Sequence, residues 1–152
     1  ALSTWPAWGP ASGGTEIDLI GRDFPAFAGI RCRFRSAMDS DHVVLAQWVS
    51  SQWLKCIAPT SATTGVSTLE YTVNEQQFSS LGHVFWYDNP IDLLSVTPQY
   101  GSPAGGTLVN LTGHHLISRW EGPDGPKRST LRCRFNNTVV GATLVRDDMV
   151  SC

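Results

Sequence analysis

The chain has 152 residues, of which 41% are hydrophobic and 16% are charged, and its formal net charge is −2. This composition excludes a disordered chain and argues against a broad basic surface for nucleic acid, and no run of about 18 apolar residues is present to span a membrane. The length suits one or two small domains. Because the sequence has no initiator Met and no signal peptide, we interpret it as a segment of a longer protein.

Two parts of the chain repeat each other. Leu2–Gly21 (LSTWPAWGPASGGTEIDLIG) aligns without a gap to Leu94–Gly113 (LSVTPQYGSPAGGTLVNLTG), with nine of 20 positions identical. The tetrapeptide RCRF then occurs at Arg31–Phe34 and at Arg132–Phe135, and an insertion at Arg119–Arg128 accounts for the longer spacing in the second copy. We predict a first repeat over 1–88 and a second over 89–152. The second is incomplete at its C-terminus, because no segment of it aligns with residues 57–87.

The local pattern is that of short strands separated by turns. Ile17 and Leu19 alternate with polar residues, as do the apolar residues of Ser67–Val73, and a turn at Asn74–Ser80 separates the latter from a last strand at His83–Asp88. A further strand is expected over His42–Cys56. The Gly-Gly pairs are interpreted as tight turns with positive φ rather than as phosphate-binding loops, because no helix follows them. No segment has a sustained helical period, so the sequence predicts an all-β fold of tandem β-sandwiches.

Four cysteines form two pairs with long spacings. Cys32 and Cys56 are 24 residues apart, and Cys133 and Cys152 are 19 apart, which is unlike the CxxC spacing of metal sites. We expect two disulfides, one in each repeat, which requires an oxidising compartment. A bridge that closes such a loop stabilises a fold by roughly 3 kcal/mol. Four buried thiols are the alternative.

The repeated pattern resembles the IPT/TIG domain. In the first copy the pattern consists of Pro6, Trp8, Gly9, Gly13-Gly14-Thr15, Gly21, Cys32-Arg33-Phe34 and Cys56-Ile57-Ala58-Pro59; in the second it consists of Pro98, Tyr100, Gly101, Gly105-Gly106-Thr107, Gly113, Cys133-Arg134-Phe135 and Cys152. The resemblance implies tandem immunoglobulin-like β-sandwiches, one complete and one truncated. It also implies a setting such as plexin-type receptors, ciliary or secreted surface proteins, Rel-type transcription factors or accessory domains of starch-acting enzymes. Cysteines at these positions resemble the extracellular branch, in which they usually pair.

Two asparagines are candidate sites for N-linked glycans. The sequons are Asn110-Leu-Thr and Asn136-Asn-Thr, and both lie in the second repeat. Asn110 is opposite in phase to Val109 and Leu111, so we expect its side chain to face outward, whereas Asn136 follows RCRF at a predicted turn. Unmodified surface asparagines are the alternative.

We expect no metal and no cofactor. His114 and His115 are adjacent in a strand-like segment, where neighbouring side chains point to opposite faces and cannot chelate one ion. Loop carboxylates are the other candidates, as ligands for Ca²⁺, but ordinary solvated acids are more common; these candidates are Asp39 with Asp41, and Asp88 with Asp92.

Five residues are candidates for contact with a partner. The arginines on either side of each RCRF cysteine should face away from the core, and Trp120 lies in the inserted loop; the candidates are Arg31, Arg33, Arg132, Arg134 and Trp120. The six tryptophans could also stack on sugars, but we favour packing as their main role.

No catalytic constellation is present, so we predict that the chain is not an enzyme. The leading hypothesis is a structural or adhesive module of a large extracellular or cell-surface protein, part of a glycosylated fibre or ciliary filament, whose partners are other protein chains or neighbouring repeats. The alternatives are a ligand-binding receptor ectodomain segment and a carbohydrate-binding accessory domain of a secreted enzyme. A transcription-factor domain ranks last, because it predicts basic loops and reduced thiols.

Overall fold

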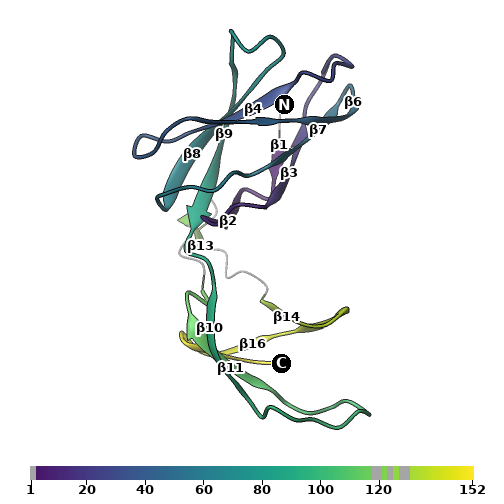
Figure 1. The fold of residues 1–152 in the computed structure, drawn as a ribbon, viewed down its shortest axis with the longest axis vertical. Helices are drawn as coiled ribbons and strands as arrows, with labels where there is room; N and C mark the ends of the chain where they lie inside the picture. The colour runs from purple at the N-terminus through teal and green to yellow at the C-terminus, as the bar shows by residue number, and fades with distance from the viewer. Residues whose placement is uncertain (1–2, 118–120, 123–124, 127–130) are drawn as a thin grey trace. The chain divides into compact units, whose positions relative to one another are not determined.

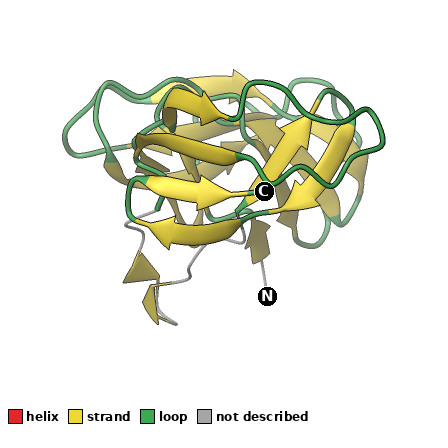
Figure 2. Ribbon diagram, turned by 90° about the horizontal axis from the view of Figure 1, so that it is seen from below, coloured by secondary structure: helices red, strands yellow, loops and turns green. Residues whose placement is uncertain are grey.

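The computed structural model describes residues 3–117, 121–122, 125–126 and 131–152, and within them it contains strands and loops but no helix (Figure 1, Figure 2). The all-β class predicted from the alternating pattern is therefore confirmed. The chain divides into two compact units, Ala1–Asn89 and Pro90–Cys152. The described residues hold no helix of the length and apolarity needed to cross a membrane.

Unit 1 is a sandwich of two sheets. The four-stranded sheet is antiparallel throughout and has the order β1 (Ser3–Trp5), β3 (Glu16–Ile20), β7 (Trp53–Ile57), β6 (Gln47–Ser50). The five-stranded sheet has the order β2 (Trp8–Pro10), β9 (Ser79–Asp88), β8 (Gly65–Thr72), β4 (Arg31–Arg35), β5 (His42–Leu45). Only the pairing of β2 with β9 is parallel.

The core of unit 1 lies between these sheets. Alternation places the apolar residues of each strand on its inner face, and the fully buried side chains include Ile17, Leu19 and Leu54 from the four-stranded sheet. On the other side, the Phe34 ring packs edge-to-face against Phe85, with ring centroids 5.9 Å apart. The core thus consists of the apolar side chains that the period-two alternation places on the inner faces of the two sheets.

A disulfide joins the two sheets of unit 1. Cys32 on β4 is bonded to Cys56 on β7, with their Cα atoms 6.4 Å apart, and both residues are buried in the core. Because 24 residues separate the cysteines, the bridge restricts the unfolded chain while it ties together strands of opposite layers.

The first Gly-Gly pair is required by the backbone. Gly13 and Gly14 have φ angles of +75° and +82°, and a Cβ on Gly13 would lie 2.7 Å from the Pro59 carbonyl carbon. Gly14 donates its N–H to the Ala58 oxygen. The pair therefore forms a tight turn against the segment that follows β7, and the same positive φ recurs at Gly105 and Gly106 in unit 2.

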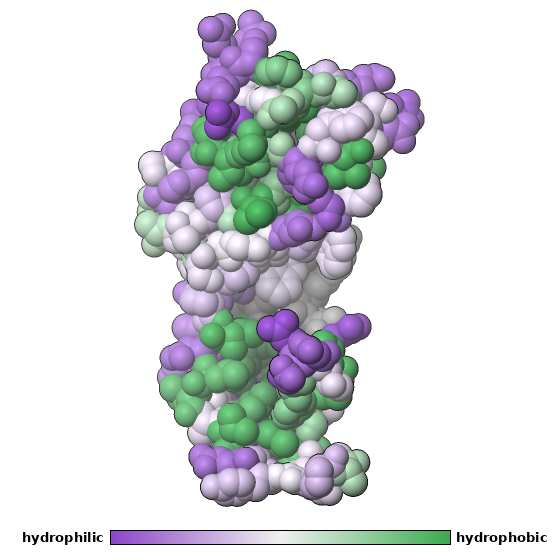
Figure 3. Space-filling view, turned by 45° about the vertical axis from the view of Figure 1, so that its right-hand side comes forward, coloured by the Kyte–Doolittle hydropathy of each residue, from purple (hydrophilic) through white to green (hydrophobic). Residues whose placement is uncertain are grey.

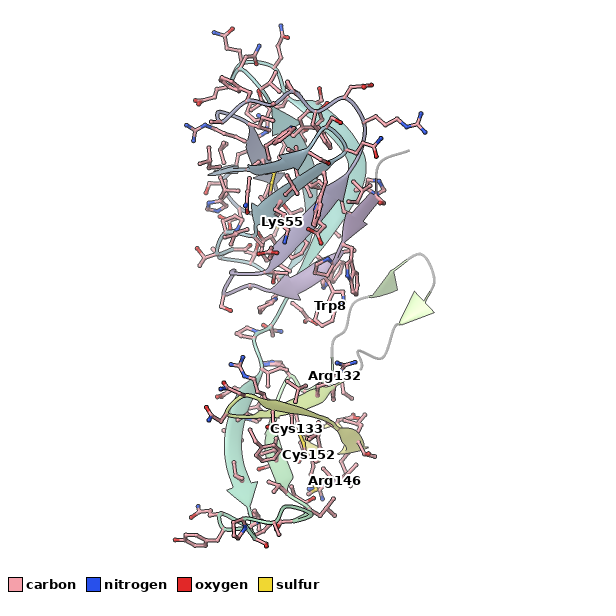
Figure 4. The ribbon with its side chains drawn as sticks, turned by 90° about the vertical axis from the view of Figure 1, so that its right-hand side faces the viewer. Trp8, Lys55, Arg132, Cys133, Arg146 and Cys152 are labelled. Atoms are coloured by element: carbon pink, nitrogen blue, oxygen red, sulfur yellow. A yellow bond between two sulfur atoms is a disulfide. The ribbon has the colours of Figure 1, made fainter. Side chains whose placement is uncertain are left out.

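Unit 2 repeats part of this arrangement. Its four-stranded sheet has the order β10 (Asp92–Thr97), β11 (Asn110–His114), β17 (Met149–Ser151), β16 (Thr143–Arg146). A separate two-stranded sheet contains β14 (Arg132–Phe135) and β15 (Thr138–Gly141), and a short pair, β12 (Glu121–Gly122) and β13 (Gly125–Pro126), lies in the predicted insertion. A disulfide between Cys133 and Cys152 joins β14 to the segment after β17 (Figure 4).

The described residues of unit 2 include no counterparts of β8 and β9. Burial differs at the second RCRF motif, where Phe135 is 44% exposed although its counterpart Phe34 is 1% exposed. Apolar side chains also cover much of the visible face of unit 2 in the lower part of Figure 3. The described part of unit 2 therefore has a smaller buried core than unit 1.

Candidate functional site

The outer face of β4 in unit 1 carries the most connected group of charges. The Arg33 Nε donates to Glu70 Oε2 on β8 at 2.6 Å, and its guanidinium lies 3.6 Å from the centroid of the Phe78 ring. Asp41 contributes a longer ion pair, at 3.8 Å. Because Arg33 and Glu70 are both largely shielded from solvent, this pair is stronger than a fully exposed one.

The other arginines of β4 also find partners within unit 1. Arg31 donates to Glu75 at 2.6 Å, and Arg35 lies 3.9 Å from Asp41. Both pairs are exposed, so each contributes little to stability. The alternation predicted from the sequence does bring these arginines to one outward face, but internal carboxylates account for Arg31 and Arg33 without a partner protein, and their role in partner binding stays a prediction.

The second RCRF motif presents its arginines differently. Arg132 and Arg134 are exposed on β14, and no carboxylate among the described residues pairs with either (Figure 4 labels Arg132). The reason lies in the partners: Glu70 belongs to β8, which has no described counterpart in unit 2, and the position of Asp41 is taken by Asn137. The arginines of the tetrapeptide are therefore paired with carboxylates in unit 1, whereas those of the second copy have no such pair among the described residues.

Asp39 connects two loops of unit 1 rather than offering a metal site. Its carboxylate accepts hydrogen bonds from the backbone N–H groups of Ala62 and Ser40, at 2.8 Å and 2.7 Å, and His42 Nε2 lies 3.5 Å away. The hydrogen bond from Ala62, followed by that from Ser40, lowers the pKa of Asp39 below its ordinary value of 3.8. Asp39 therefore anchors the β4–β5 loop to the segment before β8.

No metal-binding group of three or more His, Cys, Asp or Glu side chains occurs among the described residues. Asp41 is engaged by arginines, Asp88 accepts the N–H of Asn89, and Asp92 belongs to the other unit. His115 adopts a positive φ of 58°, and its ring centroid lies 6.3 Å from that of His114. Neither the Asp39–Asp41 pair nor the histidine pair is assembled into a metal site among the described residues.

The two sequons occupy different environments. Asn110 lies on the central strand β11, where it is half-buried and its side-chain oxygen accepts a hydrogen bond from the Ser151 hydroxyl. Asn136 is exposed in the two-residue turn between β14 and β15, with a φ of 53°. Asparagine tolerates this left-handed conformation well. Of the two side chains, that of Asn136 is the more accessible.

An apolar hollow on unit 1 was not predicted from the sequence. It has a volume of about 510 Å³, and its large apolar lining residues are Phe27, Leu45 and Trp48. The other lining residues are Ala26, Ala28, Ala46 and Gln47. The Trp48 indole donates to the Phe24 carbonyl at 3.2 Å, and the Trp53 indole donates to Asp18 at 2.8 Å. Neither tryptophan belongs to the buried cluster around the disulfide. Trp120, the other aromatic candidate, lies outside the described residues.

Comparison with known proteins shows what the repeated sandwich is. The sequence profile of the IPT/TIG domain matches residues 2–87 and 91–152, which is nearly the whole chain in two tandem copies. The chain belongs to the IPT/TIG domain family. Among curated proteins it is similar to human Plexin-B3, with 25% identity over 112 residues; this match covers 73% of the chain but 6% of the relative.

A solved structure is similar to this IPT/TIG chain in fold. It is the full extracellular region of Plexin A4, with a TM-score of 0.64 and 18% identity; the similarity covers the whole chain and 12% of that structure. At this identity the likeness shows the fold alone. The immunoglobulin-like sandwich expected from the resemblance is confirmed, and the disulfides together with the plexin relatives place these IPT/TIG domains outside the cell or at its surface.

Proposed function

We propose that this chain is a non-catalytic segment of the ectodomain of a plexin-like cell-surface receptor. The observation that carries the proposal is the tandem IPT/TIG match over nearly the whole chain, combined with the similarity to Plexin-B3. The chain spans only 6% of the length of that relative, so the proposal concerns this segment alone. The receptor ectodomain segment, an alternative in the sequence analysis, therefore replaces the structural module of a fibre. Neither the family match nor the plexin relatives support a fibre or a ciliary filament.

The physical role of such a segment is to hold neighbouring parts of a receptor in place. In unit 1, a bridge between opposite layers and a continuous buried core resist deformation. Its partners are other protein domains or chains, and N-linked glycans on its surface limit which faces those partners reach. The proposed boundary between Asp88 and Asn89 falls in the interval between the matched segments, which end at 87 and begin at 91, and it precedes the division of the two compact units by one residue.

A receptor chimera tests this proposal. The segment of Plexin-B3 that aligns with this chain is replaced by residues 1–152, and surface delivery is measured by antibody labelling of intact cells. We expect the chimera to reach the surface in amounts close to those of the parent. A matched chimera with Cys32→Ala and Cys56→Ala should be retained inside the cell, because the sheets of unit 1 lose their bridge. Intracellular retention of the unmutated chimera, with a correctly oxidised segment, would count against the receptor role.

A further inference from the structure

The loop between β7 and β8 in unit 1 has a composition that the proposed function does not use. Residues 58–64 read APTSATT, so every position is Ala, Pro, Ser or Thr, and no charged residue occurs between Lys55 and Glu70. Segments that are rich in Ser and Thr and also contain Pro are typical carriers of O-linked glycans in secreted and cell-surface proteins. The composition therefore identifies the loop as a candidate for this modification.

Hydrogen bonds attach the backbone of this loop to two other loops of unit 1. The Ser61 N–H donates to the Ala11 carbonyl oxygen at 2.9 Å, and the Ala62 N–H donates to the Asp39 carboxylate at 2.8 Å. Residues 58–64 belong to no strand, so their side chains do not alternate between the two faces of a sheet. The backbone anchors instead determine which hydroxyl groups of the loop face the solvent.

The hydroxyl groups of the segment fall into two kinds. Thr60 and Thr64 are exposed, and neither side chain has a hydrogen-bond partner among the described residues. Ser61 and Thr63 are half-buried, and the Ser61 hydroxyl donates to the Thr63 carbonyl oxygen at 2.7 Å. Further along, on β8, Ser67 is only 1% exposed. A modifying enzyme reaches an exposed, unengaged hydroxyl without opening the fold, so the structure favours Thr60 and Thr64 over the other three.

We propose that Thr60 and Thr64 are acceptor sites for mucin-type O-glycosylation, in which an enzyme of the secretory pathway transfers N-acetylgalactosamine from a nucleotide sugar. A bond forms between the threonine Oγ1 and C1 of the sugar, and the bond between C1 and the diphosphate oxygen breaks. The nucleoside diphosphate leaves with the electron pair of that bond and takes up the proton of the hydroxyl group. The inference rests on the location of the chain outside the cell or at its surface, and it does not depend on the receptor role.

The test uses the 152-residue chain, secreted from mammalian cells that lack UDP-galactose 4-epimerase. These cells make UDP-N-acetylgalactosamine only when N-acetylgalactosamine is added to the medium. After reduction of the disulfides, cleavage behind Lys55 and Glu70 releases the peptide 56–70 (CIAPTSATTGVSTLE), which contains all five of these hydroxyl groups. We expect mass spectrometry to find N-acetylhexosamine on this peptide only in the supplemented cells, and electron-transfer fragmentation to place the sugar on Thr60 and Thr64. Ser67 is the internal control and should stay unmodified.

Variants test the two positions directly. Thr60→Val and Thr64→Val keep the shape of each side chain and remove its hydroxyl, so the double variant should lose all sugar from peptide 56–70. The matched control is Thr68→Val on β8, which should retain the sugar. Incubation of the folded chain with UDP-N-acetylgalactosamine and a polypeptide N-acetylgalactosaminyltransferase gives a second readout of the same peptide that does not require secretion.

Several outcomes would overturn the proposal. They are a peptide without sugar in the supplemented cells, sugar on Ser61, Thr63 or Ser67 in place of Thr60 and Thr64, the same sugar without supplementation, and undiminished sugar in the double variant. If one of Thr60 and Thr64 stays bare, that residue is not an acceptor. None of these results bears on delivery of the receptor chimera to the surface, so the two proposals fail separately.

Discussion

Asp39 makes the stability of unit 1 dependent on pH. Its pKa is lowered in the folded chain by hydrogen bonds from backbone N–H groups, so its contribution is present above the ordinary value of 3.8 and is lost as the pH falls through the folded pKa. We expect Asp39→Asn to lower the free energy of unfolding at neutral pH and to have a smaller effect at acid pH. Urea unfolding at both pH values checks this, with Asp147→Asn at an exposed turn as the control. An equal loss at both pH values would show that the charge of Asp39 is irrelevant.

Tyr87 carries a hydroxyl that the core does not need. This group is buried and has no hydrogen-bond partner among the described residues, and burial, with a smaller effect from Asp39, raises its pKa. Removing an unsatisfied buried hydroxyl relieves its desolvation cost, so Tyr87→Phe should raise the free energy of unfolding by about 1 kcal/mol. Thermal unfolding measures the difference. A loss of stability in Tyr87→Phe would mean that the hydroxyl has a partner in solution.

The environments of the two sequons predict that N-linked glycans occupy them to different extents. Asn136 is exposed in a turn, whereas the Asn110 side chain is held by Ser151 in the middle of a sheet. After secretion from mammalian cells, we expect Asn136→Gln to remove the mass of one N-linked glycan and Asn110→Gln to leave the mass of the glycans unchanged. Intact mass before and after enzymatic deglycosylation provides the readout. Occupancy at Asn110 alone would contradict the ranking by accessibility.

At the scale of the element, the bridge between β4 and β7 is the most consequential single link. It joins strands from opposite layers through residues that are almost completely buried. Cys32→Ala with Cys56→Ala should lower the free energy of unfolding of unit 1 by about 3 kcal/mol. The matched control is Cys133→Ala with Cys152→Ala, which removes the bridge of unit 2 and should leave the unfolding of unit 1 unchanged. A midpoint in denaturant that does not move would refute this role for the bridge.

The strands could largely be predicted from period-two alternation, but the change of sheet between them could not. The run His42–Cys56 was expected to contain one strand, and it contributes to three. The chain crosses at Ala46 from β5 in one sheet to β6 in the other, and it then turns at residues 51–52 into β7. Alternation alone does not distinguish a continuous strand from a crossing of this kind. At the crossing, the backbone N–H of Ala46 donates a hydrogen bond to the Ile30 carbonyl oxygen. This contact joins residues that are distant in sequence.

The contacts of the RCRF arginines and of the apolar hollow also depend on residues that are distant in sequence. Alternation was enough to predict that the arginines of RCRF face outward, and Arg33 does so. It could not supply the partners, because Glu70 and Phe78 reach Arg33 from a strand and a loop more than 35 residues away along the chain. The hollow at Phe27, Leu45 and Trp48 was missed for a similar reason, since it is assembled from the loop at 26–28 and the segment at 45–48, where β5 ends and β6 begins.

At the scale of the whole molecule, the two units should differ in resistance to local opening. Thirteen buried residues form one cluster in unit 1, whereas the buried apolar residues described in unit 2 are Val109, Leu116, Cys133 and Val150. Amide protection follows the burial of the strands that carry the amides. In the intact chain we expect slow exchange on β3, β4, β7 and β8, and exchange faster by at least about tenfold on β10 and β14. Hydrogen–deuterium exchange by mass spectrometry resolves these segments. Equal protection in both units would mean that the exposed apolar face of unit 2 is covered in solution.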